Sequence, residues 1–127
     1  MLPVGIDVLM YNGGQDPETY NRVGPIAKQA GLGFHTWIPT MVQAPNDIIK
    51  PEWYAINGNG ESAFDKPAYV PYYKFLCPSR PETYNYLAEM YGKVADVESV
   101  DAIHLDYIRF PDVILARGLW DKYGLVM

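Results

Sequence analysis

The chain has a single cysteine, Cys77, among its 127 residues. One thiol cannot form an intrachain disulfide or a cysteine-based zinc site, so neither stabilises this fold. Long apolar runs are also missing: none approaches the roughly 18 residues of a membrane span, and no basic region followed by a signal-like apolar segment opens the chain. We therefore expect no membrane span, and an extracytoplasmic location only if a longer parent protein carries a signal upstream.

Clusters of lysine and arginine are lacking as well. The 10 Lys and Arg residues face 15 Asp and Glu residues, which gives a net charge of -5 and a pI near 4.8. This balance argues against a surface for nucleic-acid phosphates and favours neutral or weakly charged ligands. With 49% hydrophobic and 20% charged residues, the composition is that of an ordinary globular domain rather than a disordered chain. The amino-acid composition does not determine an oligomeric state.

Strand and helix signals alternate along the chain. Segments near 4–11, 32–38 and 100–111 are predicted strands. Between the first two, Asp16 and Pro17 have the residue types that begin a helix, which we expect to run to about residue 29. Pro25 is expected to kink or split this helix, and Gly31 to end it.

A second helix is predicted from residue 79 onward, because Ser79 to Glu82 has the sequence of a capping box. An apolar stripe at helical spacing follows, which we interpret as core rather than as a ligand site. Its members are Tyr84, Leu87, Ala88, Tyr91, Val94 and Ala95.

The segment from Pro39 to Pro78 is too long for an ordinary connection and is rich in Pro, Gly and aromatic residues. Loops of this length are usually functional or disordered, and the aromatic content argues against disorder. We interpret the segment as an ordered wall or lid of a substrate cleft.

The most informative segment is VDAIHLDYIRFP, from Val100 to Pro111. Alternation along a strand places Ala102, His104 and Asp106 on one face, and Ile103, Leu105 and Tyr107 on the other. An apolar outer face and a small, then polar inner face are typical of a parallel strand in a (β/α) barrel, whose catalytic groups gather at the C-terminal strand ends.

Three motifs carry a resemblance to a known family. The segments HLDYIRFP, GFHTWIPTM and LCPSRPETYNYL resemble the glycosyl hydrolases labelled family 10 glycosylhydrolase, whose fold is a TIM-type barrel, and the resemblance covers nearly the whole chain. It implies a glycoside hydrolase that acts on a polysaccharide or glycan. In broader carbohydrate-active barrels such as the α-amylases, an Asp closing the fourth strand is the nucleophile, and Asp106 is similar to it by analogy of fold.

A complete (β/α)8 barrel needs about 200 residues or more. We therefore expect residues 1–127 to be a single α/β domain, a partial barrel of parallel strands cut from a larger protein at both ends. Such a piece could be inactive by itself, and its open strand edges are expected to make it associate when expressed alone.

The resemblance points to Asp106 as the catalytic carboxylate. Arg109 is expected to orient Asp106 and keep it ionised, although a plain ion pair that fastens a loop is the alternative. Glycoside hydrolysis typically needs a second carboxyl group. We expect it in sequence beyond Met127, and the weaker candidates within the chain are Glu52, Glu61 and Asp65.

Six residues are predicted to contact the carbohydrate, and no cofactor is implied. They are Tyr11, Asn12, His35, Trp37, His104 and Arg109. Trp37 suits stacking on a sugar ring, and the histidines suit hydrogen bonds to hydroxyl groups. Two alternatives stay open: a protein that binds carbohydrate without hydrolysing it, and a metal-dependent hydrolase in which His35, His104 and Asp106 hold the ion.

Overall fold

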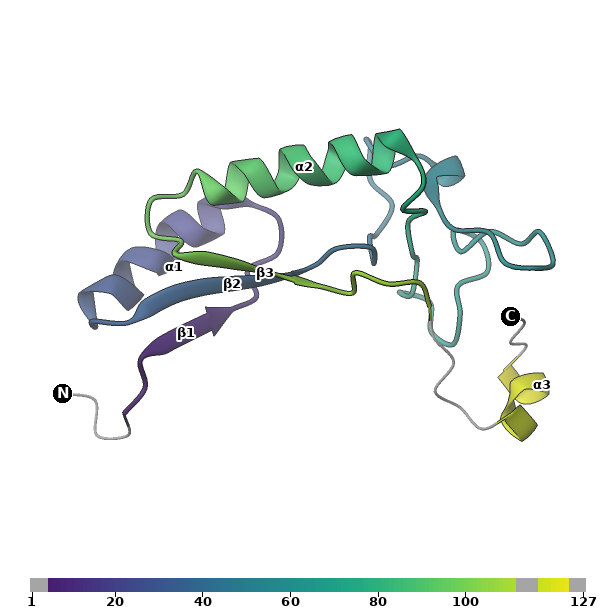
Figure 1. The fold of residues 1–127 in the computed structure, drawn as a ribbon, viewed down its shortest axis with the longest axis horizontal. Coiled ribbons are helices and arrows are strands. Elements are labelled where there is room, and N and C mark those ends of the chain that lie inside the picture. The colour runs from purple at the N-terminus through teal and green to yellow at the C-terminus, as the bar shows by residue number, and fades with distance from the viewer. Residues whose placement is uncertain (1–4, 112–116, 124–127) are drawn as a thin grey trace. The chain divides into compact units, whose positions relative to one another are not determined.

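The computed structural model describes residues 5–111 and 117–123. Its elements, in chain order, are β1 (Val8–Tyr11), α1 (Pro17–Gln29), β2 (Gly33–Pro39), the 3₁₀ helix η1 (Pro51–Trp53), α2 (Pro81–Ala95), β3 (Ala102–Asp106), the 3₁₀ helix η2 (Arg117–Leu119) and α3 (Trp120–Tyr123) (Figure 1). The chain divides into two compact units. One, called here the sheet unit, consists of Met1–Ile38 and Tyr86–Asp106; the other, the loop unit, consists of Pro39–Asn85 and Tyr107–Met127.

The sheet unit is built on one sheet with the strand order β1-β2-β3. β1 runs parallel to β2, with Val8 opposite Gly33 and Tyr11 opposite Thr36. Parallel strands joined by helices confirm the predicted α/β class. Three strands are fewer than a half barrel needs, and within residues 5–111 and 117–123 the sheet stays open rather than closing on itself.

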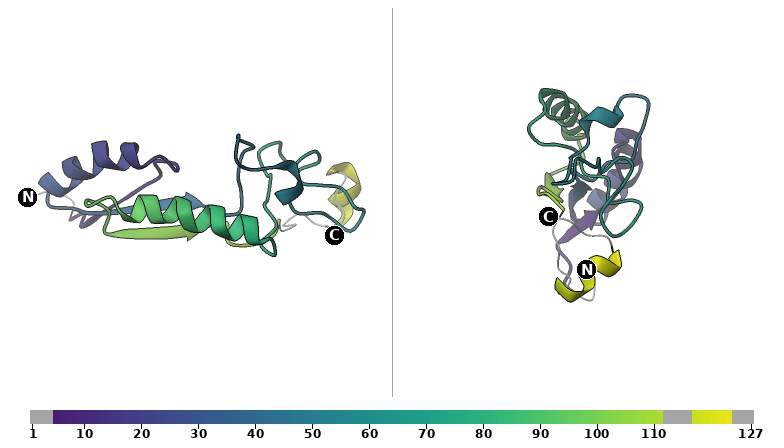
Figure 2. Two further views of the ribbon diagram at one scale, coloured as in Figure 1. Left: turned by 90° about the horizontal axis from the view of Figure 1, so that it is seen from above. Right: turned by 90° about the vertical axis from the view of Figure 1, so that its right-hand side faces the viewer.

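α1 and α2 lie on the same side of this sheet (Figures 1 and 2). Burial along β2 alternates strictly: Phe34, Thr36 and Ile38 are buried, whereas His35 and Trp37 are only partly covered. The helices therefore cover the face that carries Phe34. The opposite face, called here the open face, carries His35 and Trp37.

Local sequence signals account for both ends of α1. The Asp16 side chain accepts a hydrogen bond from the Glu18 backbone N–H at 3.0 Å, as a helix cap does. At the other end Gly31 has a φ of 77°, and its N–H and that of Leu32 donate to the carbonyls of the last turn. The helix is a single element that includes Pro25, so the predicted split does not occur.

The predicted apolar stripe of α2 is only partly correct. Leu87, Met90 and Val94 are buried, but Tyr84 is 71% exposed, and Ala88 and Ala95 are exposed too. These buried positions are three and four residues apart, as expected for one face of a helix. The buried stripe therefore lies beside the predicted apolar stripe on the surface of α2. Met90, absent from the prediction, lies at its centre.

The buried side chain of Tyr20 joins α1 to the sheet. Its hydroxyl donates to the Gly14 carbonyl at 2.5 Å and accepts a hydrogen bond from the Thr36 hydroxyl at 2.8 Å. Burial raises the pKa of Tyr20 above its ordinary 10.0. The neutral phenol thus stabilises the fold below pH 10.0, and this contribution is lost as the pH rises further.

We expect Tyr20→Phe to lower the free energy of unfolding by about 1 to 3 kcal/mol, because the fully buried Thr36 hydroxyl loses its acceptor. Urea denaturation followed by circular dichroism measures this. Adding Thr36→Val to Tyr20→Phe removes the orphaned donor, so the double variant should recover part of the loss. A double variant less stable than the sum of the two single changes would contradict this account.

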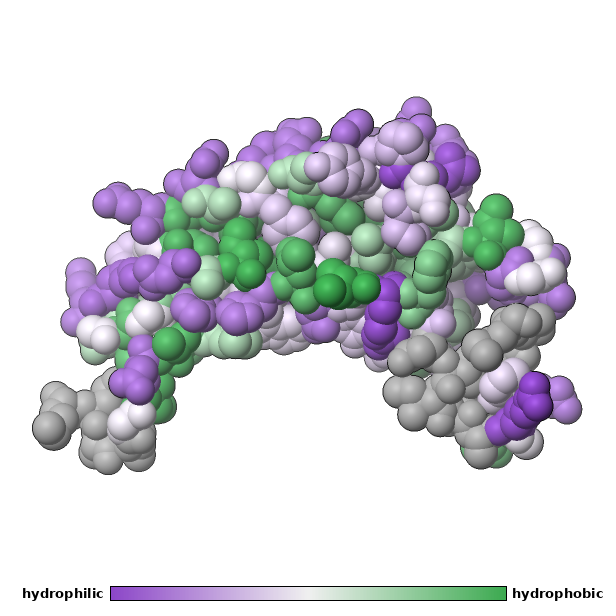
Figure 3. Space-filling model, in the orientation of Figure 1, coloured by the Kyte–Doolittle hydropathy of each residue, from purple (hydrophilic) through white to green (hydrophobic). Residues whose placement is uncertain are grey.

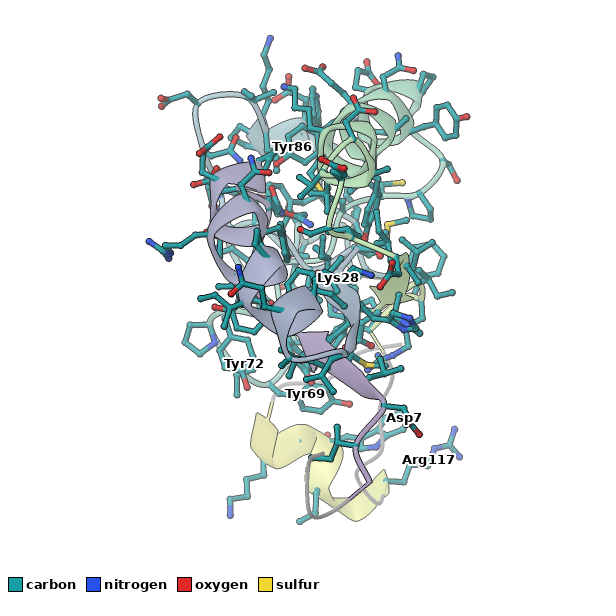
Figure 4. The ribbon with its side chains drawn as sticks, turned by 90° about the vertical axis from the view of Figure 1, so that its left-hand side faces the viewer. Asp7, Lys28, Tyr69, Tyr72, Tyr86 and Arg117 are labelled. Carbon is teal, nitrogen blue, oxygen red and sulfur yellow. The ribbon has the colours of Figure 1, made fainter. Side chains whose placement is uncertain are left out.

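At the start of β3, Asp101 connects three elements of the sheet unit. Its carboxylate accepts from the Phe34 N–H at 2.7 Å, its own N–H donates to the Phe34 carbonyl at 2.9 Å, and Lys28 of α1 pairs with it (Lys28 is labelled in Figure 4). The hydrogen bond from Lys28, followed by that from the Phe34 backbone, holds the pKa of Asp101 below its usual value. These bonds attach β3 to β2 immediately before His35.

Exposed apolar side chains remain along β3, which is an edge strand of the sheet, as is β1. Leu105, on the face opposite to Asp106, is 51% exposed. The space-filling view shows hydrophobic surface below α2 where β3 runs (Figure 3). On the open face of β1, Val8 and Met10 are similarly exposed. Parallel sheets usually have both faces covered.

The loop unit contains the long segment between β2 and α2, and this segment is ordered, as predicted. Isolated antiparallel bridges join Val42 to Phe75 and Tyr54 to Leu76. Tyr54, Phe75 and Leu76 are buried and form a small core of their own. The role of this segment as a wall or lid stays a prediction.

Candidate functional site

The only two histidines of the chain meet on the open face of the sheet unit. His35 Nδ1 lies 3.0 Å from His104 Nε2, and the ring centroids are 5.2 Å apart. The two residues are 69 positions apart in the sequence and come from β2 and β3. The metal alternative predicted that His35 joins His104 and Asp106 across a neighbouring strand, and the contact of His35 with His104 is confirmed.

Alternation along the strands extends this pair toward the C-terminal end of the sheet. Asp106 follows His104 by two residues in β3, and Trp37 follows His35 by two residues in β2, so their side chains project from the same face as the histidines. Asp106 is half-buried and is the last residue of β3. His35, Trp37, His104 and Asp106 are called here the open-face site.

The structure does not bring the predicted residues of β1 into this site. The Tyr11 ring lies on the helix-covered face, 6.4 Å from the Tyr20 ring and 6.1 Å from the Phe34 ring. Asn12 follows the strand and accepts a hydrogen bond from the Gly14 N–H at 3.3 Å, which stabilises the turn. The position of Tyr11 and Asn12 at the end of a strand therefore did not predict which residues lie beside His35, whereas the pairing of β1 with β2 identifies them.

That register places Met10 beside the site. Its Cα pairs with that of His35, so the Met10 side chain lies on the open face, where it is 51% exposed. A thioether side chain adapts to irregular apolar surfaces. Alternation along β1 separates Met10 from Tyr11, but only the pairing with β2 identifies which of the two faces His35.

Arg109 belongs to the loop unit and packs there against aromatic rings. Its guanidinium carbon lies 5.0 Å from the Tyr107 ring centroid and 5.8 Å from that of Phe75, and Nη1 donates to the Phe110 carbonyl at 3.4 Å. Such stacking on aromatic faces is typical of arginine. The predicted roles of Arg109, in orienting Asp106 and in binding the carbohydrate, both stay predictions.

Tyr107 and Tyr69 have positive backbone φ angles, 50° and 62°, which are uncommon for residues other than glycine. Both rings contact Tyr73, as does that of the exposed Tyr72 (Tyr69 and Tyr72 are labelled in Figure 4). The Tyr107 carbonyl also accepts a hydrogen bond from the Met41 N–H at 3.2 Å. Residue 107 is thus held in a turn directly after Asp106 in the sequence.

Of the three carboxylates predicted as weaker partners for Asp106, Glu61 accepts hydrogen bonds from two side chains. It accepts hydrogen bonds from Lys66 at 2.5 Å and from Asn57 at 2.9 Å, and these bonds lower its pKa, with Lys66 as the larger cause. A general acid needs a raised pKa, so this environment does not favour that role. Glu52 and Asp65 are exposed on the same unit.

The metal-dependent hydrolase considered above requires its three protein ligands, His35, His104 and Asp106, to lie in one place. Within residues 5–111 and 117–123, no three His, Cys, Asp or Glu side chains come close enough together to hold an ion. The complete shell of His35, His104 and Asp106 is therefore not assembled. In the same part of the chain, no helix has the length and apolar character needed to cross a membrane.

Comparisons with known protein families, with curated proteins and with solved structures find no match for this chain. The resemblance to family 10 glycosylhydrolases therefore stays a prediction that rests on the three sequence motifs.

Proposed function

We propose that this chain carries the catalytic carboxylate, Asp106, of a glycoside hydrolase that acts on a polysaccharide or glycan. The observation that carries the proposal is the position of Asp106 at the C-terminal end of β3, on the face that also carries His35, His104 and Trp37. In barrel enzymes, catalytic groups come from this end of the strands. The pairing of strands in chain order, with both helices on one side, also suits consecutive units of a (β/α)8 barrel.

Each residue of the open-face site has a role in this proposal. Asp106 stabilises the positive charge that develops on the sugar ring, either by electrostatics or as the nucleophile that forms a glycosyl-enzyme. Trp37 stacks on a neighbouring ring through its apolar face. The histidine pair hydrogen-bonds the sugar hydroxyls, since a neutral imidazole both donates and accepts.

One observation favours a second candidate, a protein that binds carbohydrate without hydrolysing it. On the open face of β1, β2 and β3, Asp106 is the only carboxylate, and glycoside hydrolysis usually uses two. The aromatic and imidazole groups would still recognise a sugar in the absence of a second acid.

An assay with defined probes separates these functions. The chain is incubated with labelled oligosaccharides of glucose, xylose, galactose and N-acetylglucosamine, while new reducing ends and binding are measured in parallel. Release of reducing ends supports the hydrolase. Binding without hydrolysis supports the second candidate, and the absence of both contradicts the two proposals together.

We expect Trp37→Ala to weaken oligosaccharide binding by about 1 to 3 kcal/mol, because its indole would no longer cover a sugar ring. Isothermal titration calorimetry measures the change. Tyr84→Ala is the matched control, since Tyr84 is an exposed aromatic residue of α2 outside the open-face site. Unchanged affinity in a folded Trp37→Ala variant would make Trp37 a packing residue.

A further inference from the structure

We propose that His35 and His104 together form a binding site for a divalent transition metal of the zinc and copper class. The proposal starts from their geometry: two imidazole nitrogens from different strands converge to 3.0 Å, and these rings are the only imidazoles in the chain. Imidazole is a preferred ligand for zinc, copper and nickel ions.

The separation of the two nitrogens fits a shared ion. Zinc binds imidazole nitrogen at about 2.0–2.1 Å, so two such ligands at a right angle stand about 3.0 Å apart, and two at a tetrahedral angle about 3.4 Å apart. The observed 3.0 Å lies at the first of these values. In the direct contact the two nitrogens point at each other, so both rings would rotate to aim these nitrogens at a shared ion, a change that does not require β2 to separate from β3.

The backbone around the pair is fixed from the other side of the sheet. Phe34 and Thr36, which flank His35 in β2, are fully buried against the helices. Asp101 binds both the N–H and the carbonyl of Phe34 and so holds the start of β3 on β2. Ligands positioned in this way lose little conformational freedom when they bind a metal.

The site would present two protein ligands and leave the remaining positions to water or to a bound molecule. His35 is partly covered and His104 is exposed, so solvent reaches the pair. Open coordination positions are the feature that separates catalytic and ligand-binding metal sites from closed structural ones. The proposal does not rest on glycoside hydrolysis, because metal binding is measured without a sugar.

Calorimetric titration of the whole chain with zinc chloride tests the site, with Cys77→Ser included to remove the single thiol. We expect one zinc ion per chain. His35→Gln and His104→Gln should each weaken binding by about 10²-fold or more, since each change destroys the chelate. Glu89→Gln, an exposed acid of α2, is the control and should leave the affinity unchanged.

A second measurement does not depend on the folding of the variants. The proton spectrum of the wild-type chain contains two imidazole Hε1 signals, and zinc should shift both together until one equivalent has been added. Copper(II) should bind more tightly than zinc. Binding that is not saturable at about 1 mM zinc, zinc shifts confined to one imidazole, or equal affinity in the histidine variants would overturn the proposal and leave the pair as a plain hydrogen bond.

Discussion

Asp106→Asn is expected to abolish glycan hydrolysis while oligosaccharide binding stays within about tenfold of the wild type. The amide keeps the shape of the side chain at the end of β3 but loses the negative charge that stabilises an oxocarbenium-like transition state. Ground-state binding depends mainly on stacking and hydrogen bonds, so the two measurements should separate. The rate of reducing-end release at saturating oligosaccharide reports on catalysis, and calorimetry reports on affinity.

The matched control is Asp96→Asn, which removes the same charge from an exposed position in the sheet unit. It should leave both measurements unchanged. Near-normal turnover by Asp106→Asn would remove Asp106 from the catalytic machinery. Equal loss of turnover in both variants would point to a general effect of net charge instead.

Gly24→Ala is expected to lower the free energy of unfolding by about 2 kcal/mol or more, although alanine is the better helix former. A methyl group at position 24 of α1 would lie 1.9 Å from the Ser99 Oγ, 2.6 Å from the Ser99 Cβ and 3.0 Å from the Phe34 ring. Because Ser99 lies just before β3, relief of this clash requires α1 and the start of β3 to move apart. Urea denaturation measures the loss.

Gly92→Ala is the matched control within α2. Apart from the adjacent residues and the backbone of α2 itself, no atom lies within 4 Å of the methyl group it adds, so this variant should gain about 0.5 to 1 kcal/mol from helix propensity alone. Adding Ser99→Gly to Gly24→Ala removes the clashing atoms and should restore part of the stability. If Gly24→Ala were as stable as Gly92→Ala, close packing of α1 against Ser99 would be disproved.

Local residue chemistry determined much of the secondary structure of this protein. Asp16 and Gly31 mark the ends of α1 because a capping carboxylate and a residue with positive φ act within one turn of the helix. Alternation in GFHTWIP likewise places His35 and Trp37 together on one face of β2. These features depend on neighbours in the sequence, so they are predictable from it.

Only the tertiary structure decided which faces meet. The buried stripe of α2 includes Met90 and omits Tyr84, because contact with the sheet selects among several apolar faces of one helix. The register of β1 against β2 brings Met10 rather than Tyr11 to His35. These outcomes depend on pairing between segments that are distant in the sequence. A local sequence pattern therefore does not predict them.

The contact between the two histidines is also a feature that only the tertiary structure decided. His35 and His104 are separated by 69 residues, and the sequence places each on a strand face without giving the distance between them. Their approach to 3.0 Å requires β3 to lie beside β2, which depends on α2 packing on the sheet and on the bonds of Asp101 to Phe34. Residue chemistry therefore determined what the open face carries, and packing determined which of its groups lie together, because pairing between distant segments decides which strands are neighbours and in which register.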